Sequence, residues 1–90
     1  MRYNGEEIRV FPNPVSEGNL NVSLNRFKGQ DITIQLINSL GRVVKTVQLD
    51  QADQDLINLD LSEYIDGYYK LFVIPQNNKA VEETVIIQRF

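Results

Sequence analysis

Residues Asp66 to Ile74 have the sequence Asp-Gly-Tyr-Tyr-Lys-Leu-Phe-Val-Ile. This stretch gives the clearest indication of the fold. An Asp-Gly turn pair precedes aromatic, branched and long apolar residues, the composition of a half-buried β-strand. Because side chains alternate along a strand, they divide between two faces. One face would carry Tyr69, Leu71 and Val73, and the other Tyr68, Lys70, Phe72 and Ile74. Neither face is polar throughout, so we predict a central strand with a neighbour on each side.

Shorter segments with apolar residues at alternate positions lie on both sides of this strand. The clearest is Asn19–Asn25, in which three apolar residues alternate with Asn and Ser, as in a strand with one wet face. Further strands are predicted over Ile8–Phe11, Ile32–Ile37, Val43–Leu49, Leu56–Leu61 and Ala80–Arg89. Regularly spaced short strands with turn residues between them predict an all-β fold, an immunoglobulin-like antiparallel β-sandwich of about seven strands.

Local features are predicted at the turns. Gly41 should close a hairpin loop with a positive φ, followed by a bulge because Val43 and Val44 are both apolar. Ser62 and Gly67 would begin and end a single helical turn. Tyr69 would either lock a corner through its phenol group, as in many sandwiches, or simply fill the core.

The whole chain, residues 1–90, is long enough for one domain. We expect it to be the C-terminal domain of a larger protein, with residues 1–7 as a linker. The net charge is −3 with both signs scattered, which does not favour nucleic acid or a membrane surface as partner. No apolar run approaches the roughly 20 residues of a membrane span, and residues 1–5 lack the apolar core of a signal peptide.

The residue types that carry most catalysis are missing. The chain has no His and no Cys, which removes the commonest general base, the thiol nucleophiles and the usual zinc ligands. We therefore expect no enzymatic activity, no metal and no cofactor. The acidic residues from Asp50 to Asp60 could supply oxygens to calcium, but their order does not match an EF-hand loop, which favours a solvated acidic surface.

Tyr68, Phe72 and Ile74 share the face opposite the predicted core. A bare patch of this kind marks a protein partner. Another domain or the terminal segments could instead cover it, and we favour partial cover.

Four segments together resemble the C-terminal sorting domain of the type IX secretion system, the Por secretion system family. They are Val10–Pro14 with Gly18, Ile34–Val44, Ile57–Ser62 and Gly67–Leu71. The family pattern is a Pro-Asn-Pro bend, an Asn-x-x-Gly hairpin and a Gly-x-Tyr strand before the last strand. The resemblance covers residues 8–90.

The resemblance implies a sorting signal at the C-terminus of cargo proteins of Gram-negative bacteria. Such a domain crosses the periplasm, is recognised by the outer-membrane translocon and reaches the cell surface or the medium with its cargo. A sortase-like protease commonly removes it, here upstream of about Ile8. The resemblance assigns recognition to Pro12, Asn13, Pro14, Gly41, Gly67, Tyr69, Lys70, Val85, Ile87, Arg89 and Phe90.

The last strand differs from the family at its end, because Phe90 follows Arg89, which stands in the usual basic position. A C-terminal edge strand is also a reasonable handle, since its unpaired backbone groups could be captured by strand addition. The alternative function is a structural or adhesive immunoglobulin-like module of a surface protein, including a carbohydrate-binding one, although the chain has no Trp. A small hydrolase is the weakest candidate, because it needs two carboxyl groups flanking a cleft.

Overall fold

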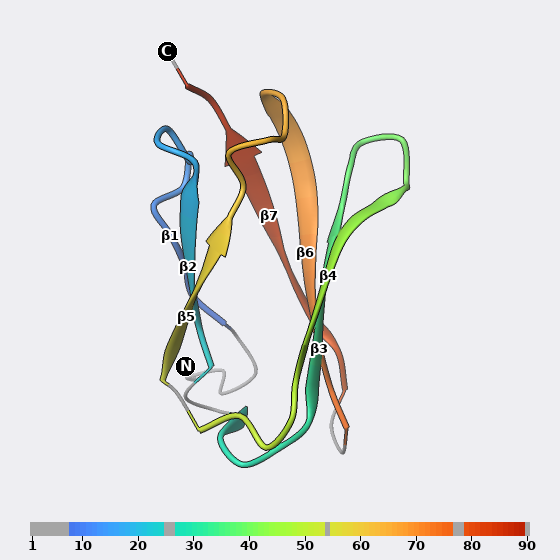
Figure 1. The fold of residues 1–90 in the computed structure, drawn as a ribbon. Coiled ribbons are helices and arrows are strands. Elements are labelled where there is room, and N and C mark those ends of the chain that lie inside the picture. Colours follow the sequence, from blue (N-terminus) through green and yellow to red (C-terminus); the bar gives the residue numbers. More distant parts are fainter. Residues whose placement is uncertain (1–7, 25–26, 54, 77–78, 90) are drawn as a thin grey trace, which may run out of the picture.

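The computed structural model describes residues 8–24, 27–53, 55–76 and 79–89. The predicted linker, residues 1–7, and Phe90 lie outside this part of the chain. Two β-sheets face each other (Figure 1). The strands are β1 (Val10–Phe11), β2 (Asn19–Ser23), β3 (Ile32–Ile37), β4 (Val43–Leu49), β5 (Leu56–Asp60), β6 (Gly67–Pro75) and β7 (Val81–Ile87). No helix among the described residues is long and apolar enough to span a bilayer.

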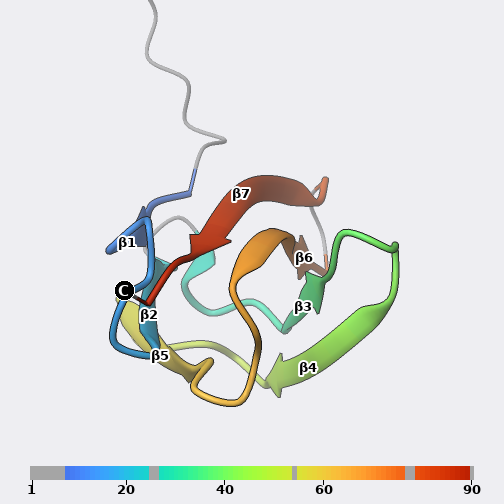
Figure 2. The ribbon, with the colours of Figure 1, turned by 90° about the horizontal axis from the view of Figure 1, so that it is seen from above.

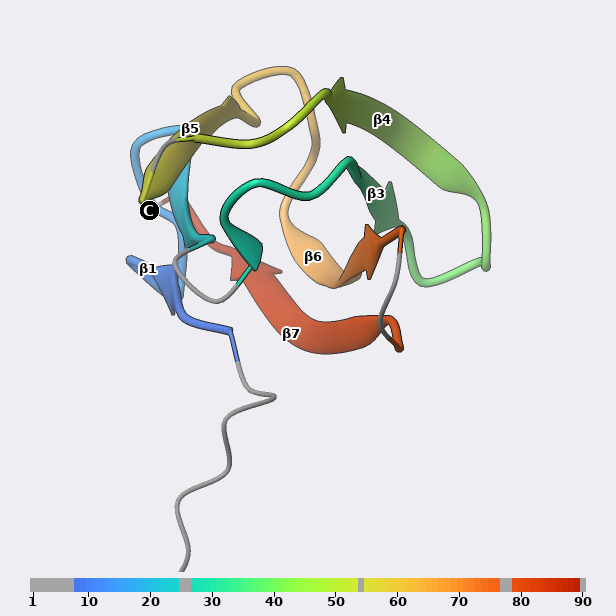
Figure 3. The same cartoon turned by 90° about the horizontal axis from the view of Figure 1, so that it is seen from below.

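One sheet has the order β1-β2-β5 and the other β4-β3-β6-β7, with every neighbouring pair antiparallel. The strand predicted to be central, β6, lies between β3 and β7. Viewed from above and below, β7 lies on the side of β1 and β4 on the side of β5 (Figures 2 and 3). Along the chain, β1 and β2 lie in the smaller sheet, β3 and β4 in the larger, β5 in the smaller again, and β6 and β7 in the larger. This alternation is typical of an immunoglobulin-like sandwich. The predicted sandwich is confirmed.

The core lies between the two sheets and follows the predicted alternation. Leu20 and Val22 of β2 and Leu71 and Val73 of β6 are fully buried. Each such side chain contributes about 1.5–3 kcal/mol through its removal from water. No polar or charged side chain is buried among the described residues. The sandwich is therefore held by an apolar centre, and its polar interactions lie at its edges and ends.

The hairpin between β3 and β4 has the predicted geometry. Gly41 has a φ of +85°. The Asn38 side-chain oxygen accepts the N–H groups of Leu40 and Arg42, both at 3.0 Å, which fixes the loop. The register between β3 and β4 shifts at the start of β4, so no residue of β3 lies opposite Val44. The predicted bulge is confirmed.

The predicted helical turn and several predicted strand bounds are wrong. β1 begins at Val10 and not at Ile8, β5 ends at Asp60 and not at Leu61, and β7 begins at Val81 and not at Ala80. β2 ends at Ser23, and Asn25 of that prediction lies outside the described residues. The segment after β5 forms one hydrogen-bonded turn, with the Tyr64 N–H on the Leu61 carbonyl at 3.2 Å, and no helical turn. Asp60 accepts the Ser62 N–H at 3.0 Å, so Asp60 caps this turn and Ser62 does not. The last strand ends at Ile87 and not at Arg89, because the chain leaves β6 there to bind other segments.

Candidate functional site

Pro12–Val15, which we name the proline strap, lies along the outer edge of β7. The Asn13 side chain acts there as a substitute peptide group. Its Nδ2 donates to the Thr84 carbonyl at 2.8 Å, and its Oδ1 accepts the Ile86 N–H at 3.0 Å. The peptide bonds preceding both prolines are cis.

The strap continues this pairing through its own backbone at Val15. The Val15 N–H donates to the Ile86 carbonyl at 2.7 Å, and its carbonyl accepts the Gln88 N–H at 2.8 Å. Val15 is fully buried and forms a parallel bridge with Ile87. The expectation of a free C-terminal edge is therefore wrong for the second half of β7, because the strap already uses its backbone groups.

Arg89 binds the connection between β5 and β6. Its Nη2 donates to the Leu61 carbonyl at 2.8 Å, and its Nη1 donates to the Tyr64 carbonyl. The same Nη1 lies 3.2 Å from Asp66 Oδ1, and the Arg89 N–H donates to Asp66 Oδ2 at 3.2 Å. The guanidinium fork suits several acceptors at once. The terminal basic residue of the motif thus ties the end of β7 to this connection.

Tyr69 forms the predicted corner. Its hydroxyl donates to the Ile65 carbonyl at 2.7 Å, four residues upstream. The side chain is also 6% exposed, so Tyr69 fills the core as well. Burial raises the pKa of the Tyr69 phenol, and also that of Tyr64, whose ring lies 6.4 Å away between centroids. Both hydroxyls stay protonated donors, the one from Tyr64 binding the Val44 carbonyl at 3.0 Å.

The structure brings together motif residues from opposite ends of the chain. Gly67 pairs with Ile87, and Tyr69 pairs with Val85, in the β6–β7 ladder. Asn13 binds β7 at Ile86, and Arg89 binds the connection that leads into β6. We name this cluster the motif end: Asn13, Gly67, Tyr69, Val85, Ile87 and Arg89. In Figure 1 the β1–β2 connection, the start of β6 and the end of β7 lie together at the top.

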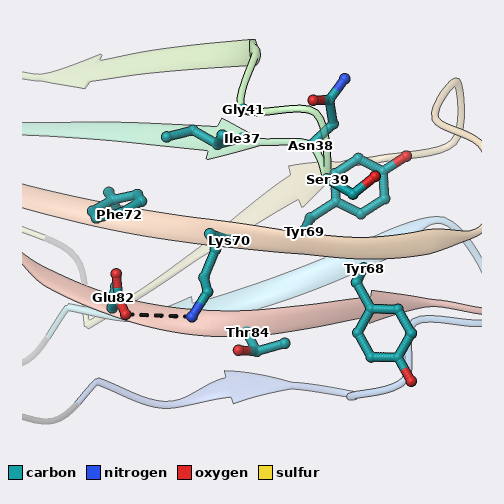
Figure 4. Close-up of a pocket in the computed structure, with 10 residues that line it drawn as sticks. All are labelled: Ile37, Asn38, Ser39, Gly41, Tyr68, Tyr69, Lys70, Phe72, Glu82 and Thr84. Atoms are coloured by element: carbon teal, nitrogen blue, oxygen red, sulfur yellow. Dashed lines mark hydrogen bonds and ion pairs between the residues drawn. The ribbon is translucent and has the colours of Figure 1, made fainter.

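The outer face of the larger sheet carries the predicted apolar patch. Tyr68 is 66% exposed and Ile74 is 37% exposed, with Phe72 half-buried between them. Tyr68 and Phe72 contribute to an open concavity of about 600 Å³, in which Lys70 Nζ lies 3.3 Å from Glu82 Oε2 (Figure 4). No described strand covers this face. The expected partial cover by terminal segments or another domain stays a prediction.

Two of the acidic residues beyond β4 have partners of their own. Asp55 pairs with Lys28 at 3.0 Å on the surface. Hydrogen bonds from Ser62 lower the pKa of Asp60. Within the described ranges, no three acidic, His or Cys side chains gather closely enough to hold a metal ion.

Sequence reasoning missed the partners of the motif residues. It treated Asp66 as a turn residue only, and it gave Leu61 no role for its carbonyl. The Arg near the end of the chain and the Asp in the turn before β6 could have suggested the ion pair. The carbonyl acceptors could not be predicted, because every residue type has a backbone carbonyl.

A search of curated proteins found no match to the chain. The model of the family described as secretion system C-terminal sorting domain matches residues 9–88, nearly the entire chain. This family supplies sorting signals and is not an enzymatic family. The adhesive module is not favoured. The chain therefore belongs to the secretion system C-terminal sorting domain family, and it is a sorting signal of type IX secretion that sends its cargo to the cell surface or out of the cell.

Proposed function

We propose that the type IX outer-membrane translocon recognises this domain in its folded form after transit through the periplasm. The observation that supports this most is the motif end. Asn13 and Thr84 are 71 positions apart, yet the Asn13 side chain binds the Thr84 backbone. Residues so distant in sequence form one surface only when the sandwich is folded.

The translocon contact includes the outer face of the larger sheet. Tyr68 immediately follows Gly67 of the motif end and is the most exposed aromatic side chain of that face. Large exposed apolar groups next to a hollow are typical of protein-binding surfaces. A sorting domain acts through protein partners, so a protein of the secretion machinery is the occupant that fits.

A sortase-like protease cuts the chain upstream of Ile8. Ile8 is 6% exposed and belongs to the core cluster, and β1 begins at Val10. Proteolysis requires an accessible, extended segment, whereas at Ile8 the chain already enters the core of the sandwich. Cleavage before Ile8 would release the cargo and leave the sandwich whole.

The test is a periplasmic reporter fused to residues 1–90 in a type IX-competent strain and in one that lacks the translocon channel. The reporter should reach the surface or the medium in the first strain and accumulate in the periplasm in the second. Equal periplasmic retention in both strains would refute the proposal. Deletion of Thr84–Phe90 should abolish export.

Tyr68→Thr tests the contact face, with Leu56→Thr as the matched control. Leu56 is an exposed apolar residue of β5, on the other sheet. Both variants should keep their thermal midpoints within a few degrees, because neither side chain belongs to the core. Export should fall for Tyr68→Thr only. Normal export of Tyr68→Thr would exclude this face as the contact.

A further inference from the structure

The edge strands of the two sheets differ in what they leave open. In the smaller sheet β1 has two residues and β5 has five. In the larger sheet the proline strap uses the outer edge of β7 at Thr84, Ile86 and Gln88. β4 has seven residues, and no described strand pairs with its outer edge (Figure 2). The longest open edge in the described part of the sandwich is therefore that of β4.

The backbone groups that point to this open edge follow from the alternation along antiparallel strands. The Gln76 N–H donates to the Asp31 carbonyl at 2.9 Å, so Asp31 faces β6. The residue after Asp31 then faces β4, where it lies opposite Leu49. Counting back from Leu49, Thr46 and Gln48 direct their N–H and carbonyl groups away from β3. An added strand would find these groups on the open edge.

The residues that flank β4 carry opposite charges. Arg42 precedes the strand and Asp50 follows it. Both side chains are exposed, and neither forms an ion pair with another described residue. When two copies of β4 pair antiparallel with Thr46 at the twofold axis, each Arg42 comes to Asp50 of the other copy. In this register Thr46 lies opposite Thr46, and the groups that point to the open edge meet each other.

Other pairings fit the charges less well. A shift by two residues in one direction places Lys45 opposite Lys45 of the other copy, and a shift in the other direction separates Arg42 from Asp50. The open edge of β5 has Asp55 before it and Asp60 at its end, so two antiparallel copies of β5 would bring carboxylates together. The charge pattern therefore favours β4, in one register, with a second copy of the chain as its partner.

We propose that two copies of this chain associate through antiparallel pairing of β4 with β4, centred on Thr46, which joins their larger sheets into one. In this arrangement the Gln48 N–H of one copy binds the Val44 carbonyl of the other. That carbonyl accepts the Tyr64 hydroxyl and has a second acceptor position. A single pair of strands buries less than the roughly 1,600 Å² of a standard interface, so the dimer is weak. The inference does not depend on the sorting function.

Sedimentation equilibrium from micromolar to millimolar concentration measures the association. The unchanged chain should dimerise toward millimolar concentration. Thr46→Pro should abolish dimerisation and stay folded, because the Thr46 N–H points to the open edge and takes no part in the pairing with β3. Circular dichroism checks that it is folded.

Charge reversal tests the register independently of that variant. Arg42→Asp and Asp50→Arg should each weaken dimerisation about 10-fold, because two exposed ion pairs per dimer become repulsive. The double variant should recover the association. Lys79→Asp is the matched control, since it changes the net charge as Arg42→Asp does but lies between β6 and β7. It should dimerise as the unchanged chain does.

Amide hydrogen exchange identifies the strand. The Thr46 and Gln48 amides should exchange several-fold more slowly at millimolar than at micromolar concentration, while the Ile34 amide of β3 should not change. A chain that stays monomeric at millimolar concentration would overturn the proposal. Dimers that persist in folded Thr46→Pro, or a double charge variant that fails to recover the association, would overturn it as well.

Discussion

Replacement of Tyr69 by Phe tests the corner that joins β6 to the preceding connection. The change deletes one hydroxyl, whose hydrogen bond to the Ile65 carbonyl is 2.7 Å long, and keeps the ring that packs in the core. A hydrogen bond of this kind contributes about 0.5–1.5 kcal/mol, and its part-buried position favours the upper half of that range. We expect about 1–1.5 kcal/mol of lost stability. For a domain of this size, that lowers the thermal midpoint by about 4–12 °C.

Tyr68→Phe is the matched control, because Tyr68 neighbours Tyr69 in sequence and lies on the solvent face. It loses the same atom from an exposed position, so its midpoint should stay within about 2 °C of the unchanged protein. Thermal unfolding followed by circular dichroism measures both. Equal midpoints for the Tyr69→Phe and Tyr68→Phe proteins would show that the corner hydrogen bond contributes nothing.

Three further predictions concern the motif end. Arg89→Ala should lower the free energy of unfolding, measured by chemical denaturation, by about 2 kcal/mol, because three acceptors lose a charged donor that is only 30% exposed. Arg89→Lys should recover less than half of that loss. Equal stability of the unchanged protein and both variants would contradict the contacts assigned to Arg89. Gly67→Val should cost about 1–3 kcal/mol, since Gly67 has a φ of +155° that branched residues avoid, and an unchanged midpoint would refute this. Burial raises the pKa of Tyr69, so the unfolded chain ionises first as pH rises. The stability that depends on the Tyr69 phenol is therefore present below about pH 10 and lost above it. The unfolding free energy of Tyr69→Phe should fall less steeply with pH in this range, and identical pH profiles of the two proteins would refute this prediction.

The layered fold follows from the sequence because the apolar spacing is regular. In β2, β3 and β6 every second residue is apolar and buried, and the register of an antiparallel sheet then leaves few choices. The Gly41 turn and the Val44 bulge could be predicted for a similar reason, since each depends on residues adjacent in sequence.

The contacts of the motif end could not be predicted in this way. Asn13 binds Thr84 and Ile86 through backbone groups, which every residue type possesses. Arg89 likewise binds two backbone carbonyls, and any surface carboxylate could have been its ionic partner. Such pairings depend on where the two sheets bring the ends of the chain, and that follows only from the assembled fold.

The most direct test is whether the last strand can sort cargo without the sandwich around it. Surface display of one reporter is compared for fusions to residues 1–90 and to residues 79–90 alone. Since the end of β7 takes its conformation from the proline strap, β6 and the connection that Arg89 binds, only the complete domain should bring the reporter to the surface. Equal display by the twelve-residue tail would mean that a linear sequence suffices and that the folded motif end plays no part in recognition.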